Sequence, residues 1–126
     1  MCHETRSLGV ILFILIGGYP PFDNKDQKVK FSLIKKGAYK FHEKYWGHVS
    51  EEVKSLVVSL LCVDPEKRLS AAEALQHEWM TMDRKSLRRS SLVCNIENLR
   101  QFNYGRKFKS AVQSVSATCV LIRLGK

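Results

Sequence analysis

The strongest constraint on this chain is a run of seven consecutive apolar residues, Val10 to Ile16. The run has no polar face at the period of a helix or of a strand, so we expect it to be buried on all sides. It is far shorter than the roughly 20 apolar residues that span a bilayer, which disfavours a transmembrane segment. The glycines and prolines of residues 17–21 would end either a helix or a strand. Periodicity alone leaves both structures open.

Helices are predicted for most of the residues that follow. Asn24 stands three residues before Gln27 and is expected to cap a short helix that Gly37 closes. Ser50 is expected to cap a second helix with inward Val53, Val57, Leu60 and Leu61. The sequence S-A-A-E at residues 70–73 predicts a capping box and a third helix, with Ala71, Ala74, Leu75 and Trp79 on its inner side. This helical context favours a helix for the apolar run as well and predicts an all-α fold.

The positive charge of the chain is concentrated in its second part. Residues 1–80 carry 11 basic and 10 acidic side chains (net +1), whereas residues 81–126 carry 10 and 2 (net +8), which together give the net charge of +9. Such a basic segment suits an acidic protein groove, a nucleic acid or an anionic membrane surface. Nucleic-acid binding is disfavoured because no groove-reading module is recognisable.

The cysteines and histidines indicate no metal or redox site. The cysteines include no C-x-x-C pair, so we expect reduced thiols, and the N-terminus lacks the design of a signal peptide. We therefore expect a cytoplasmic protein without a transmembrane segment. The histidines show neither metal-ligand nor acid-base spacing. The residues concerned are Cys2, Cys62, Cys94, Cys119, His3, His42, His48 and His77.

Five phrases follow one another in an order that is typical of one family. They are S-L-G-V-I-L at residues 7–12, G-Y-P-P-F at 18–22, Y-W-G-H-V-S at 45–50, D-P-E-K-R-L at 64–69 and A-L-Q-H-E-W at 74–79. Together they resemble the helical back half of the large lobe of eukaryotic serine/threonine protein kinases, in particular the calcium/calmodulin-dependent group. The resemblance covers residues 4–80. It implies that the apolar run is the central helix of that lobe, on which the catalytic loop is seated.

The resemblance also gives roles to single residues. It implies that Arg68 pairs with a glutamate at the end of the activation segment. Gly9 belongs to the S-L-G phrase, and Glu4 stands where the family usually has an aspartate that binds the backbone of the catalytic loop. Arg6 stands where the family usually has a tryptophan. These two positions depart from the family pattern.

The catalytic motifs of that family are absent from the sequence. It has no glycine-rich phosphate loop, no V-A-I-K lysine, no H-R-D catalytic loop, no D-F-G and no A-P-E. We therefore assign no catalytic, cofactor-binding or metal-binding residue, and ATP and Mg are implied only for a complete family member. The isolated chain is expected to be inactive. Its central helix is expected to be partly exposed, which would make the chain prone to aggregation or molten. Its expected partners are the remainder of a kinase domain, a protein substrate and calmodulin.

Residues 81–95 are predicted to form a basic linker. Ser91 follows Arg88 and Arg89 and precedes a leucine, which makes it a candidate phosphorylation site for kinases that prefer basic substrates. The alternative is a solvated linker without such a role, because short matches of this kind are frequent by chance.

Residues 96–115 have the pattern of a basic amphipathic helix. Apolar and basic side chains are spaced as in a calmodulin target, and the segment resembles the autoregulatory segment of calmodulin-dependent kinases, which occupies the substrate cleft until calmodulin removes it. A helix that packs on the lobe, a solvated arm and a membrane-surface helix remain alternatives, and residues 116–126 stay unassigned. A rival interpretation of the whole chain is a non-catalytic module that binds calmodulin or kinase partners. The predicted calmodulin-binding residues are Leu99, Phe102, Arg106, Lys107, Phe108, Lys109, Val112 and Val115.

Overall fold

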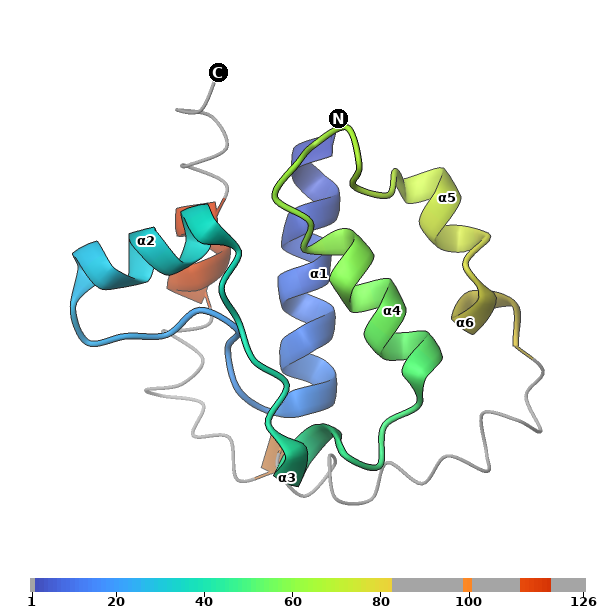
Figure 1. Cartoon of the computed structure of the whole chain (residues 1–126), viewed down its shortest axis with the longest axis horizontal. Helices are drawn as coiled ribbons and strands as arrows, with labels where there is room; N and C mark the ends of the chain where they lie inside the picture. Colours follow the sequence, from blue (N-terminus) through green and yellow to red (C-terminus); the bar gives the residue numbers. More distant parts are fainter. Residues whose placement is uncertain (1, 83–98, 101–111, 119–126) are drawn as a thin grey trace.

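A computed structural model describes residues 2–82, 99–100 and 112–118 of the chain. Every regular element within these residues is a helix, which confirms the predicted all-α class. Figure 1 shows the long first helix in the middle, flanked by α2 on one side and by α4, α5 and α6 on the other. Residues 112–118, drawn in orange-red, are helical too. The labelled helices are α1 (Cys2–Gly17), α2 (Gln27–Lys36), α3 (Glu43–Trp46), α4 (Glu51–Leu60), α5 (Ala71–Leu75) and α6 (Glu78–Thr81).

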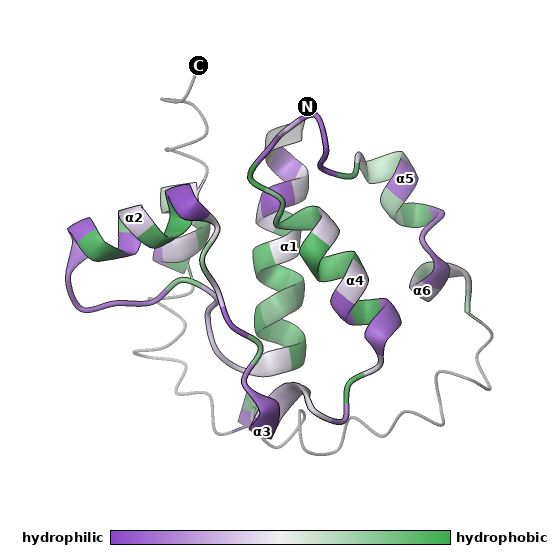
Figure 2. Cartoon of the chain, in the orientation of Figure 1, coloured by the Kyte–Doolittle hydropathy of each residue, from purple (hydrophilic) through white to green (hydrophobic). Residues whose placement is uncertain are grey.

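The apolar run lies within α1, so the choice between helix and strand is settled in favour of a helix. Figure 2 shows its uninterrupted hydrophobic colour along the lower turns of α1. The run is not buried on all sides within this chain, because Ile11 and Leu15 keep 43% and 54% of their surface exposed. Leu8, just before the run, is 51% exposed, and these values agree with the expected partial exposure of the central helix. A helix presents its side chains around a full circle, and the described elements of this chain cover only part of it.

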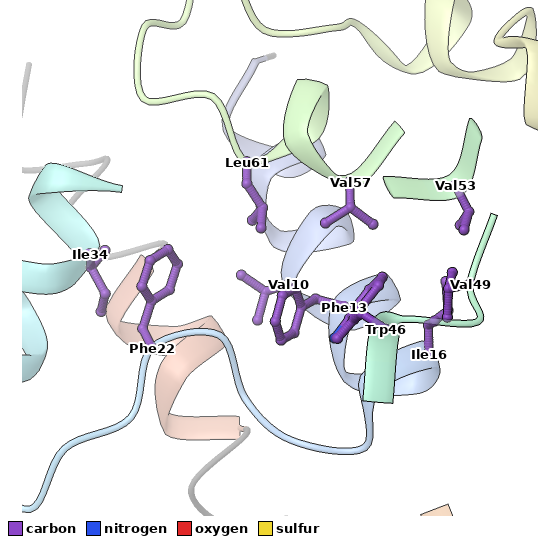
Figure 3. Close-up of a cluster of buried hydrophobic side chains, with 10 residues drawn as sticks. All are labelled: Val10, Phe13, Ile16, Phe22, Ile34, Trp46, Val49, Val53, Val57 and Leu61. Atoms are coloured by element: carbon purple, nitrogen blue, oxygen red, sulfur yellow. The ribbon is translucent and has the colours of Figure 1, made fainter. Parts of the chain in front are cut away.

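The buried face of α1 packs on α4 and on residues of the loops between α1 and α2, between α2 and α3, and between α3 and α4. Phe13 lies at the centre of this core and is fully buried. Its ring is 4.9 Å from that of Trp46, 5.1 Å from that of Tyr19 and 5.6 Å from that of Phe41, measured between centroids. Such aromatic pairs add stability beyond the area that they bury. Figure 3 shows the buried residues Val10, Phe13, Ile16, Phe22, Ile34, Trp46, Val49, Val53, Val57 and Leu61 converging from several elements.

The contact between α1 and α4 depends on a glycine. A Cβ atom at Gly9 would lie 2.9 Å from Cβ of Leu60 and 3.0 Å from Cδ2 of Leu61, so the two helices approach more closely than a larger residue would allow. On α4 the predicted inward positions are correct, since Val53, Val57, Leu60 and Leu61 are all buried.

The cap of the second helix lies two residues later than predicted. The side chain of Asp26, not that of Asn24, accepts the hydrogen bond from the backbone of Lys28, and Asn24 accepts one from the backbone of Asp26. At the other end Gly37 has a φ of 63°, the left-handed conformation that glycine adopts without strain. Ile34 in the last turn is fully buried and fixes α2 to the core.

The third predicted helix is divided into two short ones. The Ser70 hydroxyl accepts from the backbone of Glu73, and the Glu73 carboxylate accepts from the backbone of Ser70, so the predicted capping box is confirmed. Helix α5 ends at Leu75, and Trp79 belongs to α6. Neither helix contains a fully buried residue, and Leu75 is 67% exposed. The face that was expected to be buried therefore lines an open groove.

Candidate docking groove and tail segment

An apolar groove, hereafter the docking groove, runs between α1 and the helices α4, α5 and α6. It has a volume of about 420 Å³, and all of its lining residues are apolar. The exposed side chains of α1 form one wall, because Leu8, Ile11 and Leu15 follow one another at intervals of three and four residues. Leu75 of α5 and Met80 of α6 stand on the opposite side.

The docking groove can bind but cannot carry acid-base or nucleophilic chemistry. It contains no titratable side chain, whereas contiguous exposed apolar surface of this kind usually marks an interaction site. Leu75 and Leu15 are each more than half exposed, so the surface is accessible. The sequence carries a signal for this groove in the apolar positions of residues 71–79, whose spacing predicts the inner side of one helix.

A second hollow lies between the loop after α1 and the segment that follows α2. It has a volume of about 460 Å³ and is lined in part by Tyr19, Asp23, Tyr39 and Lys40. The Tyr19 hydroxyl donates to the carbonyl of Lys40 at 2.8 Å and accepts from the backbone of His42 at 3.0 Å. Burial is the main cause that raises the pKa of Tyr19 and of Tyr39. Both hydroxyls therefore stay protonated at neutral pH, and that of Tyr19 joins the loop after α1 to the segment after α2 through its two hydrogen bonds.

The helical residues 112–118 of the tail are seated on the lobe. The hydroxyl of Ser114 donates to the carbonyl of Phe22 at 2.9 Å, and that of Thr118 donates to the carbonyl of Ser114 at 2.7 Å. Both hydroxyl residues are fully buried, and Val115 packs against the core. Figure 3 shows this segment beside Phe22 and Ile34. Burial of this serine and this threonine could not be predicted from the sequence, because these residue types are usually exposed.

Three of the predicted calmodulin-binding residues lie within the described part of the chain. Val112 is 47% exposed and Val115 is half buried, and Leu99 is partly buried. The other members of the predicted calmodulin-binding set, Phe102, Arg106, Lys107, Phe108 and Lys109, lie outside the described residues, as does the candidate phosphorylation site Ser91.

The three kinase-like residues of the lobe, Glu4, Gly9 and Arg68, have different surroundings. Glu4 is exposed in the first turn of α1, where a carboxylate favours the positive end of the helix dipole. Gly9 lies at the contact of α1 with α4. Arg68 is 6% exposed, and its guanidinium donates to the carbonyls of Cys62 at 2.7 Å and Val63 at 3.0 Å. The structure therefore does not bring these residues together in one site.

The described residues do not fit ATP or its metal ion. They include no group of three or more histidine, cysteine, aspartate or glutamate side chains that could hold a metal, and the sequence has no phosphate-binding loop. We therefore derive no phosphoryl-transfer step through this chain. Among the described helices, none is both long and apolar enough to cross a membrane.

Comparison with protein families finds a match in the first part of the chain. The protein kinase domain matches residues 4–80, which is more than half of the chain. The chain belongs to the protein kinase family. The predicted resemblance is thereby confirmed. In this kinase chain α1 is the helix that carries the S-L-G-V-I-L phrase, and the docking groove lies along its uncovered face.

The curated relatives are calcium- and calmodulin-dependent kinases. The chain is 39% identical over 124 residues to a calcium and calcium/calmodulin-dependent serine/threonine-protein kinase of Lotus japonicus, covering 98% of this chain and 24% of that protein. It is 41% identical over 109 residues to the calcium/calmodulin-dependent protein kinase type II alpha chain of Drosophila melanogaster, covering 86% and 21%. A Medicago truncatula kinase is 38% identical over 125 residues, covering 98% and 24%. The kinase chain thus spans about a quarter of the length of these relatives.

Proposed function

We propose that this chain is the large-lobe portion of a calmodulin-dependent serine/threonine kinase, inactive alone and completed by further kinase-domain segments. In a complete family member the activity would be ATP-dependent protein phosphorylation in the cytoplasm. The observation that carries the proposal is the docking groove. Its apolar wall lies on α1, and the resemblance to the kinase family implies that α1 is the central helix of the large lobe. The exposed side chains of α1 are those that a complete kinase domain would be expected to cover.

Inactivity of the isolated chain is tested by phosphate transfer. The purified chain, incubated with radiolabelled ATP, Mg²⁺ and a mixed protein substrate, should transfer no more phosphate than a blank. Addition of the segment of a relative that carries the ATP-binding and catalytic motifs should produce ATP binding and, with it, phosphate transfer. Turnover by the isolated chain above the blank would overturn the proposal, because the residues that position the phosphates are not in this sequence.

We further propose that the tail binds calmodulin through the residues predicted from the sequence. The basic amphipathic pattern of residues 99–115 supports this, and so does the naming of the relatives as calmodulin-dependent. Val115 would have to leave its place on the core to enter a calmodulin groove, since one face of a helix cannot pack on two surfaces. Calmodulin binding and seating of residues 112–118 should therefore exclude each other.

A peptide of residues 99–115 tests the calmodulin proposal separately from catalysis. It should shift the mobility of calmodulin in Ca²⁺ and not in a chelator. The matched control carries Phe102→Asp and Val115→Asp, which place charges at two apolar anchors and should abolish the shift. A peptide that gives no shift at micromolar concentration, or an equal shift by the control, contradicts the proposal.

We also propose that Ser91 is a phosphorylation site. A kinase that prefers basic substrates should incorporate phosphate into the chain, and this incorporation should be lost in Ser91→Ala.

The docking groove also supports the alternative of a non-catalytic module that competes for kinase partners. Such a module needs an accessible apolar surface but no catalytic groups, and the exposed groove supplies that surface. The two functions differ in the effect of the added segment. Restored phosphate transfer indicates a kinase portion, whereas binding without transfer and inhibition of an intact relative indicate a competing module.

A further inference from the structure

The outer side of α2 carries a basic surface with one aromatic ring in it. This surface, hereafter the basic face, is formed by Lys28, Phe31, Lys35 and Lys36. The three lysines are exposed, and Phe31 keeps 36% of its surface in contact with solvent. Figure 1 shows α2 on one side of α1 and the helices that border the docking groove on the other, so a partner in the docking groove would leave the basic face open.

The opposite side of α2 holds the basic face in a fixed position. Ile34 on that side is fully buried, and Lys30, which is 4% exposed, pairs with Asp23 at 3.5 Å between Nζ and Oδ1. The Asp26 side chain caps the helix by accepting a hydrogen bond from the backbone of Lys28 at 2.9 Å. A partner can therefore bind the outer side without first ordering the backbone of α2, and such preorganisation favours affinity.

The stability of the helix accounts for only part of the charge on the basic face. Lys35 and Lys36 stand in the last turn of α2, where a cation suits the negative end of the helix dipole. Lys28 stands in the first turn, where the dipole disfavours a cation. The ion pairs found in the described part of the chain are made by other lysines, so no carboxylate there forms an ion pair with the basic face. The basic face is therefore suited to an acidic partner.

The order of side chains around α2 favours an acidic protein segment over a membrane surface. Phe31 follows Lys28 by three residues and precedes Lys35 by four, so its ring stands between two lysines on one side of the helix. Val29, also exposed, is turned away from Phe31 by about 160°, since successive residues of a helix are turned by roughly 100°. A helix that lies on a membrane needs its apolar side chains together on the side that enters the lipid. Those of α2 are separated by its lysines.

We propose that the basic face of α2 is a docking surface for an acidic segment of a partner protein, in which carboxylates stand on either side of an apolar side chain. Lys28 and Lys35 are separated by about 10 Å along the helix axis, a distance that about three residues of extended chain cover. The carboxylates of such a segment can contact both ammonium groups while its apolar side chain packs on the Phe31 ring. Charge complementarity of this kind selects partners and speeds association. The proposal goes beyond the proposed function and needs neither phosphate transfer nor calmodulin.

A labelled acidic peptide tests the proposal on the full chain. The fluorescence anisotropy of the peptide E-E-A-L-A-E-E should rise and saturate as the chain is added. Binding should weaken when NaCl is raised from about 50 to 300 mM, because salt screens exposed charges. It should also weaken when the leucine of the peptide is replaced by serine, because the apolar contact is lost. A carbodiimide, which joins carboxylates to amines in contact, should link the peptide to Lys28 or Lys35, as mapped by mass spectrometry.

A pair of charge-matched variants makes the test specific for α2. Lys28→Gln combined with Lys35→Gln should weaken peptide binding by roughly fivefold, the loss expected for two exposed ion pairs. It should leave the melting temperature unchanged, because both side chains are exposed. Arg84→Gln combined with Lys85→Gln removes the same charge from the basic linker and should change binding by less than about twofold.

Four results would overturn the proposal. They are an equal loss of binding in the two double variants, links only to lysines outside α2, equal binding of the leucine and serine peptides, and binding of the chain to anionic lipid vesicles through Lys28 and Lys35 without binding of the peptide. The last result would indicate a membrane surface. A chain that transfers no phosphate and ignores calmodulin but binds the peptide through α2 would keep this docking surface and lose the proposed function.

Discussion

The hydroxyl of Ser114 donates a hydrogen bond to the backbone carbonyl of Phe22, which lies 92 positions earlier in the chain. Ser114 is fully buried, and its hydrogen bond joins the tail to the turn that follows the central helix. Phe22 is also the ring beside Arg6. The seat of residues 112–118 is therefore in contact with the start of α1 through one aromatic residue.

Replacing Ser114 by alanine should loosen the tail without unfolding the lobe. The change removes one donor, and the carbonyl of Phe22 loses its partner, so we expect a loss of about 1 kcal/mol of stability. Hydrogen exchange of residues 112–118 should accelerate, while that of α4 should not. Ser116→Ala, at an exposed position of the same segment, is the control. Equal exchange in wild type and Ser114→Ala would show that the bond does not hold the segment.

Gly9→Ala should destabilise the lobe although alanine favours helices. The added methyl group would lie 2.9 Å from Cβ of Leu60, an atom attached to the α4 backbone that cannot turn away. Overpacking costs about 1 to 3 kcal/mol, against a gain of about 1 kcal/mol in helix propensity. Urea unfolding should show a lower midpoint than for Ser55→Ala, an exposed change on α4. A raised midpoint would mean that α1 and α4 are not in close contact.

Leu15→Lys should weaken the binding of a hydrophobic dye to the docking groove and leave stability almost unchanged. Leu15 is 54% exposed on the wall of the docking groove, so a charge there interrupts apolar surface but buries little. We expect weaker binding of a hydrophobic dye and a change in unfolding free energy within about 0.5 kcal/mol. Val58→Lys, 47% exposed on α4 and outside the groove, is the matched control. Dye binding that falls equally in both variants would mean that the groove is not the binding surface.

Tyr39→Phe should protect the lobe against alkali. Burial raises the pKa of Tyr39, so the folded state keeps its proton while the unfolded chain loses it near pH 10. The stability due to the neutral hydroxyl is complete below pH 10 and is lost as the pH rises through the folded-state pKa. Thermal melts of the variant should match wild type at pH 7 and lie above it near pH 11. An equal loss in both proteins would assign the alkaline effect to other groups.

The sequence predicted the helices of this chain better than it predicted their surroundings. The capping box at Ser70 and the closing Gly37 were recognisable because caps depend on a few local atoms. The inward face of α4 followed from helical spacing for the same reason. The cap of α2 was misplaced, because Asn24 and Asp26 both suit a cap and only the backbone geometry decides between them.

The groove and the buried Arg6 could not be predicted, because they depend on which elements cover α1. A run of seven apolar residues indicates burial, yet the described part of the chain covers one face and leaves Ile11 and Leu15 exposed. The sequence shows Arg6 only as a departure from the family pattern. Its burial depends on Phe22 and Ile34, which are distant in the sequence and which the fold places around it.

The docking groove makes the stability of the folded chain depend on the concentration of a partner. A partner that binds the groove of the folded chain only raises the free energy of unfolding by an amount that grows with the logarithm of the partner concentration, so the melting temperature should rise when the partner is abundant. Without it, the same surface is available to chaperones and proteases, which act on transiently open forms. The lifetime of this chain in a cell should therefore increase with the concentration of the partner that occupies the docking groove beside Leu15.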